Sequence, residues 1–235
     1  MRGGDYMVVA ADPDAVKEQT RVDDILGPFS RRLSNGGEYL EIRSHTGRLM
    51  NSITYDNDGP WPAAADGSGA TLAKIDSQGA TEDRNNWTFS HEVGGTPGKQ
   101  NFSRQDLELD QDNLQFHEVA SGIADAFWVE LKNASQNSID LNGLIIASSE
   151  GQQHRLDHHV IEAGGYVLLD QTTLRFAPAP NDKMLVYSPN GRRVLDAVRS
   201  RTGSRVDRPH TRDAGRLPNL RHRAQPISST CGTRL

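Results

Sequence analysis

The chain has 235 residues, one cysteine and a formal net charge of −5 at pH 7. That length accommodates one or two domains, and a single cysteine excludes an internal disulfide. No apolar run is long enough for a transmembrane helix, and the polar residues after Met1 do not resemble a signal peptide, so we predict no membrane insertion.

The first half of the chain predicts a strand, a short helix and a hairpin. Residues 3–12, GGDYMVVAAD, combine two glycines with an apolar run, and Asp12 and Pro13 favour the start of a one- or two-turn helix. Alternation in residues 35–62, NGGEYLEIRSHTGRLMNSITYDNDGPWP, predicts a half-buried antiparallel hairpin. With a two-residue turn at Thr46 and Gly47, the expected pairs are Leu40/Ile53, Ile42/Asn51 and Ser44/Leu49.

Two further strands are expected before a charged linker. ATLAKID and NNWTFS have strand-like composition, and GGTPGKQN terminates the pattern. The charged composition of residues 103–112, SRQDLELDQD, predicts a linker between two modules.

The second half predicts more strands, including LQFHEV, FWVELKNAS, IDLNGLIIASS and HHVIEAGGYVLLD. In FWVELKNAS, Phe127, Val129 and Leu131 point one way, whereas Trp128 and Glu130 point the other. Because helical periodicity is scarce and Gly-rich turns are frequent, the fold class is predicted to be all-β.

The second half repeats features of the first. A shift of 144 residues aligns DKMLVYSPNGRRVLDAVR, residues 182–199, with the first hairpin and predicts the pairs Met184/Ala197 and Val186/Leu195 around an Asn-Gly turn. Upstream, GGYVLLD at residues 164–170 matches the Gly-Gly strand at residues 3–12. We therefore predict a tandem repeat rather than a circular permutation.

The motifs WVELKNAS, IDLNGL, EAGGYVLLD and LVYSPNGRRVLDAV, with NNWTFSHEVGGTPGKQN in the other copy, resemble the lamin tail domain family of bacterial proteins. The resemblance implies immunoglobulin-like β-sandwich modules. It divides the chain into a module at residues 1–102 that lacks its first strands, the linker at 103–112, and a module at 113–199 that lacks its end. Such incomplete copies are expected from a fragment or a truncated frame.

Residues 200–235 form an Arg-rich tail. From Arg199 onward the chain holds nine arginines, two aspartates and no lysine. With few apolar residues and no alternation, we expect the tail to be disordered or translated out of frame, and nucleic-acid binding through it is an alternative.

Few residues suggest metal or catalytic chemistry. Asp56 and Asp58 in DNDG have the first spacing of a calcium loop, but the rest of the loop pattern is missing, and turn formation alone explains them. His154, His158 and His159 have no cysteine or clear carboxylate partner. No nucleophile elbow or phosphate-binding loop occurs, so we predict no enzyme activity and no cofactor.

Four residues are considered for a binding surface. Trp61 and Trp87 could form an aromatic platform, although covering a sandwich edge is the simpler interpretation. Glu130 and Asn133 could line a groove, although they could also satisfy backbone groups at strand ends.

The combined expectation is a non-catalytic module that binds a protein or an extracellular polymer, or acts as a spacer, within a larger secreted or surface protein. The alternative is an accessory module of a secreted hydrolase, such as a nuclease, whose catalytic domain lies outside this chain. The first module should be the less stable one unless another chain completes it.

Overall fold

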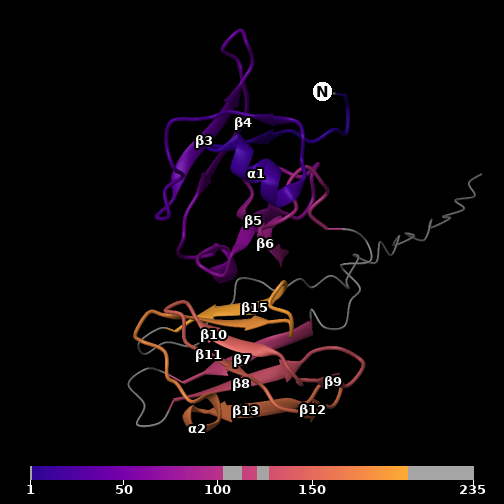
Figure 1. Cartoon of the computed structure of the whole chain (residues 1–235), viewed down its shortest axis with the longest axis vertical. Coiled ribbons are helices and arrows are strands. Elements are labelled where there is room, and N and C mark those ends of the chain that lie inside the picture. Colours follow the sequence, from indigo (N-terminus) through magenta and orange to yellow (C-terminus); the bar gives the residue numbers. More distant parts are fainter. Residues whose placement is uncertain (1, 103–112, 121–126, 201–235) are drawn as a thin grey trace, which may run out of the picture.

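A computed structural model describes residues 2–102, 113–120 and 127–200. Within them the chain is all-β, with mostly antiparallel strands and short helices, as predicted. Figure 1 shows the elements of residues 2–102 in one half of the molecule and those of residues 113–200 in the other. The predicted linker at 103–112 and the Arg-rich tail beyond Ser200 lie outside the described residues.

The first elements are two short strands around a helix. Strands β1 (Val8–Val9) and β2 (Ile25–Leu26) pair in parallel, and α1 (Pro13–Thr20) lies between them in sequence. The carboxylate of Asp12 accepts a hydrogen bond from the Ala15 N–H at 3.0 Å, and Pro13 occupies the first turn. This is the predicted cap, because an Asp oxygen satisfies an N–H that has no partner within the helix.

The first hairpin consists of β3 (Glu38–Arg43) and β4 (Leu49–Tyr55). The predicted pairs Leu40/Ile53 and Ile42/Asn51 are confirmed. The third predicted pair is wrong, because a bulge at Ile42/Arg43 places Arg43 opposite Leu49.

The turn of this hairpin and its burial also differ from the prediction. The connection holds three residues rather than two, since the Ser44 N–H donates to the Arg48 carbonyl at 2.9 Å, and Gly47 adopts a φ of 81°. The hairpin is not half-buried: Ser52 alone of its strand residues is buried, and Tyr39, Ile42, Leu49 and Met50 are exposed.

The strands expected after the hairpin pair with each other. A 3-10 turn, η1 (Ala63–Ala65), lies between the hairpin and the first of these two strands. A second 3-10 turn, η2 (Arg84–Asn86), lies between the two strands. Strands β5 (Ala70–Lys74) and β6 (Trp87–Val93) are antiparallel, with Leu72 opposite Phe89.

Residues 113–200 form two main sheets. One has the strand order β13-β8-β7, with β7 at Leu114–Val119, β8 at Trp128–Asn133 and β13 at Tyr166–Asp170. The other has the order β11-β10-β14-β15, with bounds Gln153–Arg155, Ile145–Ser148, Lys183–Tyr187 and Val194–Arg199. The remaining elements are β9 (Ile139–Asp140), its partner β12 (Val160–Ile161), and α2 (Gln171–Leu174).

The main core lies between these two sheets. One sheet contributes Phe116, Leu131 and Leu169, and the other contributes Ile146, Val186 and Val198. The predicted alternation in β8 is confirmed, since Val129 and Leu131 are fully buried and Glu130 is only partly covered. Two sheets that bury their facing side chains give a sandwich-like arrangement.

The predicted register of the second hairpin, β14–β15, is wrong by one residue over most of its length. Met184 lies opposite Val198 and Val186 lies opposite Asp196. A bulge at Val186/Tyr187 and a longer connection cause the shift, since the Ser188 N–H donates to the Arg193 carbonyl at 3.0 Å. Pro189 suits the second position of a type I turn, which explains why the two-residue Asn-Gly turn does not form.

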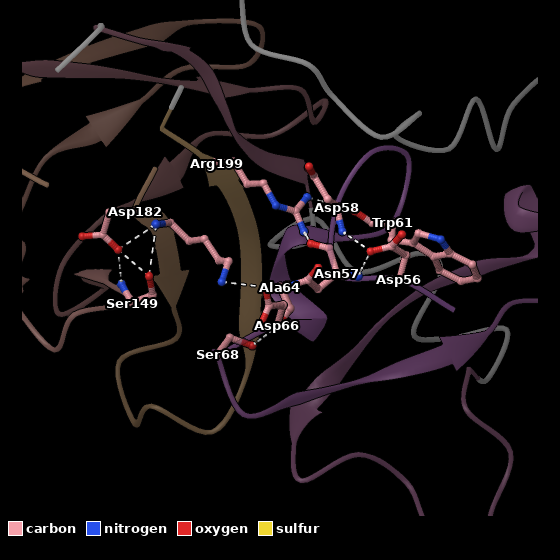
Figure 2. A network of polar contacts seen from close by, with 11 residues as sticks. Asp56, Asn57, Asp58, Trp61, Ala64, Asp66, Ser68, Ser149, Asp182 and Arg199 are labelled. Atoms are coloured by element: carbon pink, nitrogen blue, oxygen red, sulfur yellow. Dashed lines mark hydrogen bonds and ion pairs between the residues drawn. The ribbon is translucent and has the colours of Figure 1, made fainter. Parts of the chain in front are cut away.

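The β14–β15 hairpin is buried on both faces, by different parts of the chain. Met184 and Val186 face the main core. Leu185, Val194 and Ala197 belong to a second cluster with Ala63, Ala64 and Ala70. Polar contacts surround this second cluster (Figure 2). The segment that follows the first hairpin therefore packs onto the sheet of residues 113–200.

Candidate binding surface

The solvent-facing side of the sheet β13-β8-β7 carries a group of side chains that the pairing brings together. Because Val129 and Leu131 point into the core, Glu130 and Lys132 point outward. Lys132 lies opposite Tyr166, and Glu130 lies opposite Leu168. We call the group formed by His117, Glu130, Lys132, Tyr166 and Leu168 the outer-sheet surface.

A bulge brings His117 into this group. In β7, Phe116 pairs with Leu131 and Glu118 pairs with Glu130, so His117 is the additional residue between them. His117 Nδ1 lies 2.6 Å from Glu130 Oε1, within hydrogen-bond distance. The bulge therefore directs the imidazole toward the neighbouring strand.

Tyr166 is held in place by two of these neighbours. Its ring meets the His117 ring edge to face at 4.9 Å between centroids, and Lys132 Nζ lies 5.4 Å from the Tyr166 centroid. Even so, Tyr166 is 48% exposed and Leu168 is 57% exposed. The surface thus presents an aromatic and an aliphatic side chain beside a fixed set of charged and polar groups.

Strand β13 is also an edge strand among the described strands, because its one strand partner there is β8. At its end, Asp170 caps α2 and accepts hydrogen bonds from the Thr173 N–H at 2.8 Å and from the Thr172 and Thr173 hydroxyls. These bonds, led by the one from the Thr173 N–H, lower the pKa of Asp170 to about 2.

Of the residues considered from the sequence, Glu130 lies on this surface and Asn133 does not. The Asn133 side chain is fully buried, and its amide donates to the carbonyls of Asn137 (2.7 Å), Ile161 (2.9 Å) and Glu162 (3.1 Å). Its Oδ1 accepts from the Ser135 N–H at 2.9 Å. Asn133 satisfies backbone groups, which corrects its consideration as a groove residue.

The two tryptophans do not form an open platform. Trp61 is only 3% exposed, so its side chain is not presented to a partner, contrary to the surface role considered for it. Trp87 is partly buried, and its Nε1–H donates to the Thr81 carbonyl at 2.8 Å.

In the part of the chain that the structure describes, no group of three or more His, Cys, Asp or Glu side chains converges as a metal site. Asp56 Oδ1 accepts from the N–H groups of Asn57 (2.7 Å) and Asp58 (3.3 Å), which is a turn contact. His158 instead lies 3.0 Å from Asp140 Oδ2. The pKa of Asp140 is lowered, first by the Asn142 N–H and also by His158.

Sequence reasoning missed four of the five residues of the outer-sheet surface. The alternation of GGYVLLD places Tyr166 and Leu168 on one face, which was an available signal. The position of His117 had no such signal, since it depends on a bulge.

No known family model matches this chain, and neither does any curated protein sequence. Neither of the two helices in the described ranges has the length and apolar character needed to cross a bilayer.

Proposed function

We propose that this chain is a non-catalytic binding module that contacts a protein partner through the outer-sheet surface. The observation that carries this proposal is the exposure of Tyr166 beside Leu168 while His117 and Lys132 hold the tyrosine ring in place. The resemblance to bacterial lamin tail domains supports placing the module, as an immunoglobulin-like sandwich, in a larger secreted or surface protein.

The composition of this surface favours a protein partner. Tyrosine contributes a large contact area at a small cost in conformational entropy and is enriched at protein interfaces. Contacts from His117 and Lys132 reduce that cost further, because the ring is ordered before binding. Glu130 and Lys132 lie on adjacent positions of the outward face, where opposite charges can orient a partner.

The edge position of β13 adds a second mode of contact. An extended segment of a partner can pair with the backbone of an edge strand, and its side chains then meet the exposed residues of that strand. On β13 these residues are Tyr166 and Leu168.

The test is selection of binding peptides from a displayed random peptide library against the immobilised full chain. Selected peptides should bind the wild type and lose at least about tenfold in affinity for the double variant Tyr166→Ala/Leu168→Asp, since the aromatic anchor is removed and a charge is introduced. Each variant is first checked for an unchanged urea midpoint.

The matched control is Tyr39→Ala/Leu49→Asp, which changes the same residue types at the exposed sites of the first hairpin. Peptides should bind this control as they bind the wild type. Peptides that bind both double variants equally well, or a library that yields no binder, would contradict the proposal.

A further inference from the structure

Alternate residues of β13 have their backbone hydrogen-bonding groups on opposite sides of the strand. The Asn133 N–H donates to the Gly165 carbonyl at 3.0 Å, and the Gln171 N–H donates to the Phe127 carbonyl at 2.8 Å. The register of β13 on β8 is unbroken between these two bonds. Because hydrogen-bonded and non-hydrogen-bonded positions alternate in an antiparallel pair, the odd-numbered residues of β13 bond to β8.

The N–H and C=O groups of Tyr166 and Leu168 therefore point away from β8. These residues occupy the non-hydrogen-bonded positions of the pair, and β13 is the end strand of its sheet (Figure 1). The described residues supply no strand on that side. The four backbone groups are thus directed toward the place that an added strand would take.

The other end strand of this sheet is closed by a side chain. On β7, the Asn113 carbonyl accepts a hydrogen bond from the Ala134 N–H, which places Phe116 at a non-hydrogen-bonded position. The Phe116 N–H points away from β8 and donates to the carboxylate of Asp196 on β15 at 2.7 Å. Of the two ends of the sheet, β13 is therefore the one whose edge remains open among the described residues.

Strand β13 also lacks the features that usually prevent an edge strand from pairing. Such strands commonly carry proline, lysine or a bulge. The residues of β13, YVLLD, include neither proline nor lysine, and its register has no bulge. In contrast, the end strand β11 of the other sheet consists of Gln153, His154 and Arg155. A regular, apolar edge such as β13 is suited to pair with another strand.

Building on the function proposed above, we propose that the partner is an extended peptide segment that pairs antiparallel with β13 as a fourth strand of this sheet. Both existing pairings in the sheet are antiparallel, which favours the same orientation for the added strand. The partner residues opposite Tyr166 and Leu168 each exchange two backbone hydrogen bonds with β13. Their side chains lie beside Tyr166 and Leu168 on the outer-sheet surface, because directly opposite residues share a face.

This geometry specifies the side chains of the partner segment. Apolar or aromatic side chains fit opposite Tyr166 and Leu168, since cross-strand pairs of such residues stabilise a sheet. Two positions before the residue opposite Leu168, a lysine or arginine meets Asp170. The segment therefore has a basic residue at its first position and apolar residues at its third and fifth positions. Its fourth residue lies beside Val167, which packs against the core.

The test uses the peptides selected against the full chain in the experiment described above. Each peptide is resynthesised with one backbone N-methyl group, placed at each position in turn, which removes a donor and keeps the side chain. N-methylation at the third or fifth position should weaken binding at least about tenfold, because it removes a hydrogen bond and blocks close approach of the strands. The fourth position is the matched control and should change affinity less than about threefold.

Hydrogen exchange of single amides, followed by NMR on the labelled full chain, tests the protein side. In the free chain, the amides of Tyr166 and Leu168 should exchange faster than those of Val167 and Leu169, which bond to β8. A bound peptide should slow exchange at Tyr166 and Leu168 at least about tenfold.

The outcomes separate this inference from the proposed function. Peptides that lose affinity for the Tyr166→Ala/Leu168→Asp variant, but show no alternation on N-methylation or no protection of the two amides, would overturn strand pairing and leave the proposed function standing. Peptides that bind this variant as they bind the wild type would overturn both.

Discussion

Lys183 on β14 and Asp66 beyond η1 form an ion pair of 2.7 Å that joins the two halves of the molecule. Both side chains are largely covered, and the apolar cluster of Ala64, Leu185 and Val194 lies in the same contact. The segment after the first hairpin is thereby part of the same packed body as residues 113–200.

A double-mutant cycle on Asp66→Ala and Lys183→Ala measures the ion pair. Because the pair is less exposed than an ordinary surface pair, we expect a coupling free energy of about 1 kcal/mol in urea unfolding, at the upper end of values for surface pairs. Added salt should reduce it. The solvent-exposed pair of Lys17 and Asp23 is the control and should give less coupling. Additive effects at Asp66 and Lys183 would show that the pair contributes nothing.

Asn133→Ala should destabilise the fold by about 1–3 kcal/mol, because buried carbonyls and the Ser135 N–H lose a partner inside the protein. Urea unfolding followed by tryptophan fluorescence gives the value. The exposed Asn142→Ala is the matched control and should change the unfolding free energy by less than about 0.5 kcal/mol. Equal effects of the two substitutions would exclude the proposed role of the buried amide.

The lowered pKa of Asp170 predicts that its contribution to the stability of the fold is lost at acidic pH. The pKa of Asp170 in the folded state is about 2, below its ordinary value of 3.8. The charged carboxylate therefore stabilises the fold at pH values above 3.8. This contribution falls as pH decreases from 3.8 toward about 2. The stability difference between the wild type and Asp170→Ser, measured by urea unfolding at about pH 5 and about pH 2.5, should therefore shrink at the lower pH. A difference that stays constant would show that the carboxylate is not responsible.

The β3–β4 hairpin should exchange its amide hydrogens faster than β8. Its strand residues are mostly exposed, whereas alternate residues of β8 are fully buried, so local opening of the hairpin costs less free energy. Hydrogen exchange followed by mass spectrometry of the full chain makes this comparison. Equal and high protection in both would contradict it.

Local patterns predicted several elements correctly. Alternation identified the inward faces of Val129 and Leu131, and the Asp12-Pro13 pair identified the start of α1. These features depend on neighbours in sequence, which is why they are visible there.

The register of β14–β15 could not be predicted in the same way. Register is set by the hydrophobic pattern only where one face is buried, and this hairpin buries apolar residues on both faces. Both hairpins have a bulge at aligned positions, Ile42/Arg43 and Val186/Tyr187, and both turns contain a glycine of positive φ.

The packing of residues 61–93 onto β14–β15 and the outer-sheet surface could not be predicted from the sequence for another reason. Ala63 and Ala64 are small residues with no distinctive pattern, and their partner Val194 is distant in sequence. His117 reaches Glu130 only because of a bulge in β7. Such contacts follow from tertiary packing rather than from local propensity.

Hydrogen exchange of Ala64→Arg in the full chain tests the central claim, the packing of residues 61–93 onto β14–β15, most directly. A buried charge at this site should open the contact, so amides of β5–β6 and also of β15 should exchange faster while those of β8 remain protected. Ala80→Arg, at an exposed position, is the control and should leave β15 unchanged. If Ala64→Arg raises exchange only around residues 61–74 and leaves β15 as in the wild type, the two halves are not packed as described.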